Sequence, residues 1–144
     1  MGSGGGAPGI PLAWALPERH VTLLEASARK CEFLGLVSRD FANIAVVRGR
    51  AEEQPLERFG VAVAKALAPP PVAAEWCLPL VSTGGAVVLF VGATADRARV
   101  ARAAGKVGGE LVDSPAGLVV LRKAGATPAG FPRRPGIARK RPLA

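Results

Sequence analysis

The stretch that decides the fold is Gly4-Gly5-Gly6-Ala7-Pro8-Gly9-Ile10-Pro11-Leu12-Ala13, near the start of a chain of 144 residues. A glycine-rich turn that leads into a helix lets a ligand approach the backbone closely, because no Cβ atom stands in the way. The spacing Gly4-x-Gly6-x-x-Gly9 fits the dinucleotide-binding fingerprint, and the lack of Gly-Lys-Ser/Thr excludes a P-loop. An artificial glycine–serine linker could also begin this way, but the continuation through Pro8-Gly9-Ile10-Pro11 argues against it.

The next segment supplies a carboxylate at a suitable distance from this turn. Residues 20–25 (HVTLLE) predict a buried strand, and Glu25 at its end lies 19 residues after Gly6. A carboxylate in this place can accept hydrogen bonds from both hydroxyls of an adenosine ribose. The two features together indicate an adenosine-containing cofactor, and both NAD and S-adenosylmethionine satisfy them.

Outward from this start, short apolar strands alternate with helical segments. We expect helices over 10–16, 27–38 (with Ser27 as N-cap), 72–80 and 95–104, and strands over 20–25, 44–48, 61–66, 86–91, 110–112 and 118–122, with a turn at 82–85. Such alternation predicts an α/β fold with a mostly parallel sheet, and the last two strands predict a closing antiparallel hairpin. We expect a core over 1–123 and a basic Pro/Arg-rich tail over 124–144, which has no helical or strand period.

The excess positive charge is concentrated at the C-terminal end. The chain has 19 basic and 11 acidic residues, and seven of the basic ones, but no acidic one, fall within 122–144. This asymmetry favours a polyanionic partner, either RNA or an anionic membrane. A solvated, disordered tail without a partner is the alternative.

Several classes of site and location are disfavoured by the sequence. Cys31, Cys77 and the single His20 have no metal-ligand spacing, so no metal site is expected. No signal peptide is recognisable, and the most apolar stretch, residues 86–91, is too short to span a bilayer. We therefore expect a soluble, cytoplasmic protein.

The motifs, taken in order, resemble those of the RsmG/GidB family of 16S ribosomal RNA guanine-N7 methyltransferases. The most specific matches are the glycine turn followed by Pro8-Gly9-Ile10-Pro11-Leu12-Ala13, and the C-terminal Phe131-Pro132-Arg133-Arg134-Pro135-Gly136-Ile137. Between them lie Leu23-Leu24-Glu25, Gly49-Arg50-Ala51-Glu52-Glu53 and Glu75-Trp76-Cys77-Leu78-Pro79-Leu80. The resemblance covers essentially the whole chain, and Pro8 favours it over a dinucleotide turn.

The resemblance implies a class I, Rossmann-like methyltransferase that moves a methyl group from S-adenosylmethionine to a guanine N7 in 16S ribosomal RNA, alone or in the small ribosomal subunit. It implies a monomer at full length. The cofactor-binding residues it implies are Gly2, Gly4, Gly6, Ala7, Glu25, Ala51, Glu52 and Lys65. Lys65 would also be the catalytic residue, and the RNA-binding residues would be Arg133, Arg134, Arg139, Lys140 and Arg141.

The chain departs from the family pattern in three places. It begins at the glycine turn, without the family's first strand and N-terminal helical region, so we expect the strands ending at Glu25 and Lys65 to flank a vacant position. On this basis we expect the isolated chain to be aggregation-prone and inactive. Ala64-Lys65-Ala66 stands where the family has Ser/Thr-Arg-Ala, and Val91-Gly92 where it has Lys-Gly. The alternatives are an inactive RNA-binding relative and a nicotinamide-dependent oxidoreductase.

Overall fold

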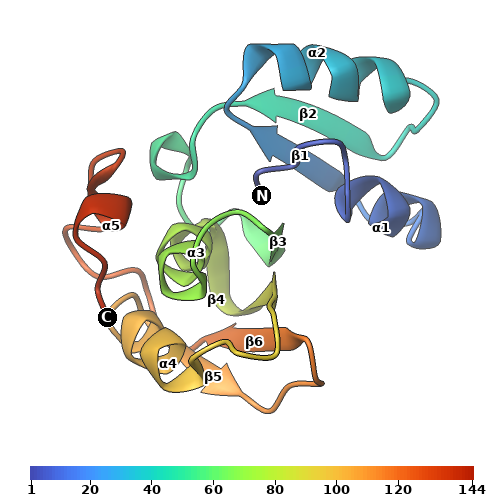
Figure 1. The fold of residues 1–144 in the computed structure, drawn as a ribbon. Coiled ribbons are helices and arrows are strands. Elements are labelled where there is room, and N and C mark those ends of the chain that lie inside the picture. The colour runs from blue at the N-terminus through green and yellow to red at the C-terminus, as the bar shows by residue number, and fades with distance from the viewer. The chain divides into compact units, whose positions relative to one another are not determined.

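The computed structural model describes residues 1–144 as two compact units, Met1–Arg50 and Ala51–Ala144 (Figure 1). No helix in it has the length and apolarity that crossing a bilayer requires.

The first unit holds two helices and a two-stranded parallel sheet. Its elements are α1 (Gly9–Ala15), β1 (Val21–Glu25), α2 (Ala28–Val37) and β2 (Ile44–Arg48). The strands pair in register from Val21–Ile44 to Glu25–Arg48. Leu23 and Leu24 of β1 and Leu34 of α2 are buried, so apolar side chains on both elements hold this unit together.

The second unit is built around a four-stranded mixed sheet. Its elements are η1 (Ala51–Glu53), β3 (Phe59–Lys65), α3 (Pro70–Cys77), η2 (Leu78–Leu80), β4 (Val81–Phe90), α4 (Arg97–Gly105), β5 (Gly109–Val112), β6 (Leu118–Lys123) and α5 (Ile137–Lys140). The strand order is β3-β4-β6-β5, in which β3 and β4 are parallel and β6 is antiparallel to both of its neighbours.

The core of the second unit lies between this sheet and α3 and α4, which pack against each other. Alternate residues of the central strands, among them Val87, Leu89, Val119 and Leu121, are fully or almost fully buried. This period of two is what a sheet with one covered face requires. The opposite face of the edge strand β3 carries Val61, which is 56% exposed.

The predicted order of elements and the closing antiparallel hairpin are confirmed, and the differences have local causes. The helix expected over 72–80 is α-helical only to Cys77, and the 3₁₀ turn η2 follows, with Pro79 unable to donate a backbone hydrogen bond. The helix expected from residue 95 begins at Arg97, because Asp96 caps it by accepting the amide of Arg99 at 3.0 Å. Ser27 is at the N-cap position of α2, but its side chain makes no capping bond.

Two expectations are corrected. Residues 82–85 are not a free turn but a bulge within β4, where the pairing with β3 shifts between Phe59–Val81 and Val61–Ala86. Gly84 has a φ of +88° there. Glycine adopts such values readily, which is why the sequence predicted a turn at this place. The tail, which shows no periodicity in sequence, contains the short helix α5.

The strands β1 and β3 are each an edge of their own sheet. Hydrogen bonding joins β1 to β2 alone and β3 to β4 alone. These are the two strands that end at Glu25 and Lys65. Each therefore leaves one side without ladder partners.

Candidate functional site

In the first unit, the glycine turn is fastened to the end of β1 through Glu25. The amide of Gly4 donates to Oε2 of Glu25 at 2.9 Å, and the amide of Ser27 donates to Oε1 at 2.9 Å. The amide of Ser3 also donates to the carbonyl of Leu24 at 3.1 Å. The structure thus fastens to Glu25 the turn that contains Gly2, Gly4, Gly6 and Ala7, with Gly4 as the residue of this set that bonds to the carboxylate.

The charge of Glu25 is stabilised by this arrangement. The side chain is 8% exposed. Burial alone would raise its pKa, but the hydrogen bonds from the Ser27 and Gly4 amides, with the nearby charge of Lys30, outweigh burial and lower the pKa of Glu25. A carboxylate has about four acceptor positions, so after these two bonds each oxygen keeps capacity for a ligand hydroxyl.

The glycines allow both the turn and its close packing. Gly2, Gly4 and Gly6 have φ values of +59°, +54° and +99°, a region that other residues rarely adopt. A side chain at Gly9 would collide with Leu23, so this glycine lets α1 approach β1. The amides of Gly5 and Ala7 meet no acceptor within the chain, so the turn offers two backbone donors beside the Glu25 carboxylate.

In the second unit, two of the predicted cofactor residues lie in η1 and the third lies at the end of β3. Ala51 is buried in η1, and Glu52 accepts a long bond (3.4 Å) from the amide of Gly136. Lys65 is exposed at the end of β3, and Ala66 after it has a φ of +51°. An alanine in this left-handed region is strained, and such strain gathers at functional sites.

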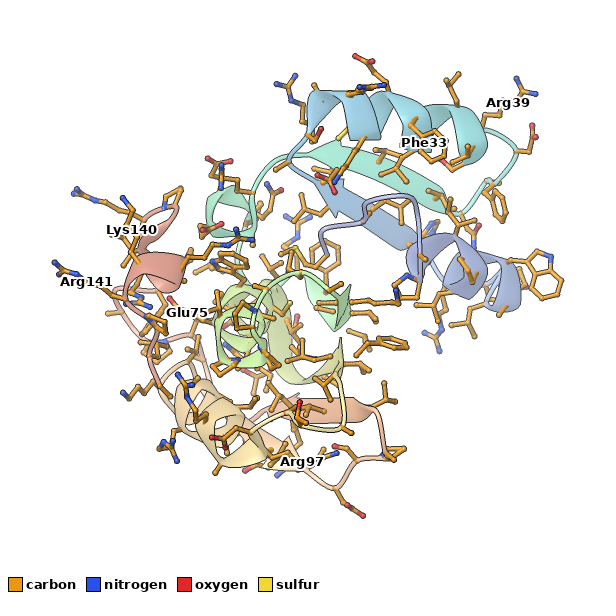
Figure 2. The ribbon with its side chains drawn as sticks, viewed as in Figure 1. Phe33, Arg39, Glu75, Arg97, Lys140 and Arg141 are labelled. Carbon is orange, nitrogen blue, oxygen red and sulfur yellow. The ribbon has the colours of Figure 1, made fainter.

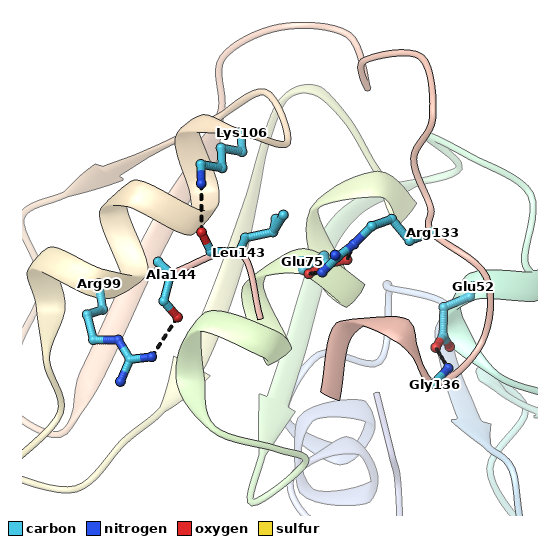
Figure 3. Close-up of polar contacts among 8 residues, drawn as sticks. All are labelled: Glu52, Glu75, Arg99, Lys106, Arg133, Gly136, Leu143 and Ala144. Carbon is cyan, nitrogen blue, oxygen red and sulfur yellow. Dashed lines mark hydrogen bonds and ion pairs between the residues drawn. The ribbon is translucent and has the colours of Figure 1, made fainter. Parts of the chain in front are cut away.

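The basic tail is held against α3 by an ion pair between Arg133 and the buried Glu75. Nε and Nη2 of Arg133 each lie 2.6 Å from the carboxylate oxygens of Glu75, which is 2% exposed on α3 (Figure 3). The bidentate bond to Glu75 outweighs partial burial and raises the pKa of Arg133. Farther along, Lys106 donates to the carbonyl of Leu143 at 2.7 Å.

A second attachment lies at the beginning of the tail. Lys123 is fully buried and its Nζ donates to the Thr127 hydroxyl at 2.6 Å and to the carbonyl of Val107 at 3.2 Å. The amide of Thr127 donates to Oε1 of Glu57 at 2.7 Å. Desolvation lowers the pKa of Lys123, partly offset by the charge of Glu57. Lys123 is therefore an internal residue and not part of a solvated basic tail.

The other cations of the tail differ in their surroundings. Arg122 pairs with Glu110. The guanidinium of Arg139 lies 5.3 Å from the ring centroid of Trp76 and donates to the carbonyl of Leu67 at 3.3 Å. Arg134, Lys140 and Arg141 are exposed, and their side chains make no hydrogen bond or ion pair within the chain. The side chains of Lys140 and Arg141 point outward in Figure 2.

Sequence reasoning missed Glu75, Lys123 and Glu57 as polar anchors. The signal for Glu75 was present, since a lone carboxylate within the apolar run 72–80 requires a buried partner. Its partner lies 58 residues away, which no spacing rule reveals. No group of His, Cys, Asp and Glu side chains in the structure could hold a metal ion.

Comparison of the sequence identifies a matching family and several related proteins. Residues 1–107 match the GidB family, described as rRNA small subunit methyltransferase G. The proteins called ribosomal RNA small subunit methyltransferase G from Synechococcus elongatus and Rubrobacter xylanophilus are each 36% identical over 99% of this chain. The chain spans 67% and 63% of the length of these two relatives.

Comparison of the structure finds the class I methyltransferase fold. M. jannaschii TYW2, solved with AdoMet, aligns with a TM-score of 0.67 at 16% identity, over 84% of this chain and 63% of its own. The antibiotic-resistance methyltransferase Kmr aligns with a TM-score of 0.66 at 15% identity, over 87% of this chain and 84% of its own. At these identities the likeness concerns the fold.

Proposed function

The chain belongs to the GidB family of rRNA small subunit methyltransferases G, and we propose that it transfers a methyl group from S-adenosylmethionine to N7 of a guanine in 16S ribosomal RNA. The observation that carries this proposal is the pair of bonds that ties Glu25 to the amides of Gly4 and Ser27. The partner would be 16S ribosomal RNA or the small ribosomal subunit. A cytoplasmic location would follow from that partner.

The residues of the glycine turn fit an adenosine cofactor. The Glu25 oxygens retain capacity for the ribose hydroxyls, and the amides of Gly5 and Ala7 are available donors. A Cβ atom at Gly5 would meet nothing within 4 Å, so the space beside the turn is open. Ala51, Glu52 and Lys65 are the further cofactor contacts that we propose from the family resemblance.

The proposed reaction depends little on proton transfer. The cofactor supplies an electrophilic methyl group when bound. Guanine N7 carries a lone pair and no proton, so no general base is needed, which fits a chain with one histidine and no catalytic constellation. Glu25 would orient the ribose, and the ammonium of Lys65 would hold the substrate in place.

We propose that the cations of the tail divide into two roles. Arg134, Lys140 and Arg141 would contact RNA phosphates, because their side chains are exposed and have no partner in the chain. Arg133 is engaged by Glu75, so it would shape the RNA-binding surface from within. Arg139 lies over Trp76 but is exposed, so it could still contact RNA.

The test is methyl transfer from isotopically labelled S-adenosylmethionine to unmodified 16S ribosomal RNA and to small subunits. We expect the label on one guanine, with strand cleavage at that base after reduction and aniline treatment. Glu25→Ala is the negative control. Binding of RNA and S-adenosylhomocysteine without any transfer would instead support the inactive relative, which the Lys65 and Val91 departures favour.

A further inference from the structure

A hollow in the second unit is not part of the proposed cofactor site. It has a volume of about 510 Å³. Its walls come from the start of α3, from α4, and from the tail, namely Pro69, Pro71, Val72, Arg99, Arg139, Pro142 and Ala144. Two of these seven residues carry arginine side chains and none carries an acidic side chain, so the side chains of the lining favour an anion.

Both arginines are oriented by bonds at the margin of the hollow. Nη2 of Arg99 donates to the main-chain oxygen of Ala144 at 2.6 Å (Figure 3). Arg139 lies over the ring of Trp76 and donates to the carbonyl of Leu67. A guanidinium has five N–H donors, so each arginine keeps donors for a ligand while its position is already restricted.

The start of α3 contributes an apolar wall and no hydrogen-bond donors. Pro70 and Pro71 have no N–H group, and the amides of Val72 and Ala73 both donate to the carbonyl of Pro69. The N-terminus of α3 is therefore closed to an anion. Recognition of charge would depend on the two arginines, while the prolines offer a surface to a sugar or base.

We propose that this hollow binds one phosphodiester of single-stranded RNA, with the adjoining nucleoside against the prolines. The proposal rests on the proposed function for the identity of the polymer. The hollow has a volume of about 510 Å³, and a water molecule occupies roughly 30 Å³. A lone inorganic anion, which takes the place of one or two waters, would therefore leave most of the hollow unfilled. The mixture of apolar wall and guanidinium groups suits a nucleotide unit better than inorganic phosphate.

The variants Arg99→Gln and Arg139→Gln test the site. Glutamine removes the charge but keeps a donor for the main-chain oxygens of Ala144 and Leu67. Arg102→Gln is the matched control, because it removes the same charge from α4 at an exposed position that does not line the hollow. Unchanged melting temperatures would establish that all three variants keep the fold.

Binding of a labelled single-stranded 16S fragment is measured by anisotropy over a series of salt concentrations. We expect about tenfold weaker binding for each hollow variant, and a salt slope reduced by about 0.7 for the pair, as one lost phosphate contact requires. Equal losses in Arg102→Gln, or no RNA binding by the unaltered chain, would overturn the proposal. Inorganic phosphate that competes at the same concentration as a nucleotide would overturn the assignment to RNA.

Methyl transfer is measured on the same proteins to separate this proposal from the proposed function. RNA binding that depends on Arg99 and Arg139, without methyl transfer, would support the hollow and contradict the enzyme. Methyl transfer with hollow variants that behave like Arg102→Gln would support the enzyme and contradict the hollow.

Discussion

Arg133 places two guanidinium nitrogens 2.6 Å from the carboxylate of Glu75, a side chain that is 2% exposed on α3. This pair joins the family's C-terminal signature to the core of the second unit. A residue that in sequence belongs to a basic tail is thus the counter-ion of a buried acid.

The first prediction concerns this pair. Arg133→Met should destabilise the second unit by about 3 kcal/mol or more, because it leaves a buried carboxylate without a partner. Arg134→Met, the exposed neighbour, should change stability by less than about 0.5 kcal/mol. Denaturant unfolding measures both. Adding Glu75→Leu to Arg133→Met should restore most of the loss, and a double variant no better than the single one would contradict this account.

The second prediction concerns the cofactor. Glu25→Ala should weaken binding of S-adenosylmethionine about tenfold to a hundredfold, since charge-assisted bonds to the ribose are lost. Glu32→Gln, which removes an exposed carboxylate from α2, is the control. Isothermal calorimetry gives both affinities, and equal affinity for Glu25→Ala and the unaltered chain would remove Glu25 from the site.

The third prediction concerns pH and the buried thiol of Cys77. Desolvation raises the pKa of Cys77 to about 12 from an ordinary value of 9.0. Above pH 9 the unfolded thiol loses its proton while the folded one keeps it, so folding stability falls between pH 9 and 12, by up to about 1.4 kcal/mol per pH unit. Cys77→Ala should remove this loss, as measured by urea unfolding at several pH values.

The urea unfolding experiment is interpreted from the difference in stability between Cys77→Ala and the unaltered chain at each pH. Lys123 acts in the opposite direction, because desolvation lowers its pKa despite the charge of Glu57, so its contribution raises stability as pH approaches 10.5. Only the change caused by Cys77→Ala isolates the thiol.

The fourth prediction concerns Lys65. Lys65→Met should lower the rate of methyl transfer at least tenfold, because it removes a cation from the end of β3, while Lys65→Arg should retain or raise the rate through its bidentate fork. Arg102→Met is the control for loss of one positive charge. Transfer that is insensitive to both Lys65 variants would exclude this residue from catalysis.

The fifth prediction concerns the open edges of the two sheets. We expect the 144-residue chain to self-associate, because β1 and β3 each have one unpaired side and Val61 is 56% exposed on β3. Val61→Lys should reduce light scattering, whereas Val37→Lys on α2 should have little effect. A monodisperse chain with a sharp thermal transition that rises with S-adenosylhomocysteine would contradict this expectation.

Local chemistry made much of the fold predictable. The order of strands and helices follows from apolar periodicity, which short segments carry within themselves, and the closing hairpin follows from the two strands around the Asp113–Gly117 connection. The glycine turn and Glu25 could be assigned to one site because Glu25 ends the strand that follows the turn, 19 residues after Gly6.

The sequence by itself thus determined the α/β class, the element order and the glycine turn with its carboxylate, because these depend on interactions between near neighbours. Only the tertiary structure decided that residues 82–85 form a bulge, that Lys123 is internal, and that Arg133 and Arg139 pack on α3. Charge alone cannot distinguish a solvated arginine from a buried counter-ion. That difference depends on whether another part of the chain folds against the arginine and supplies a partner group and a low-dielectric environment.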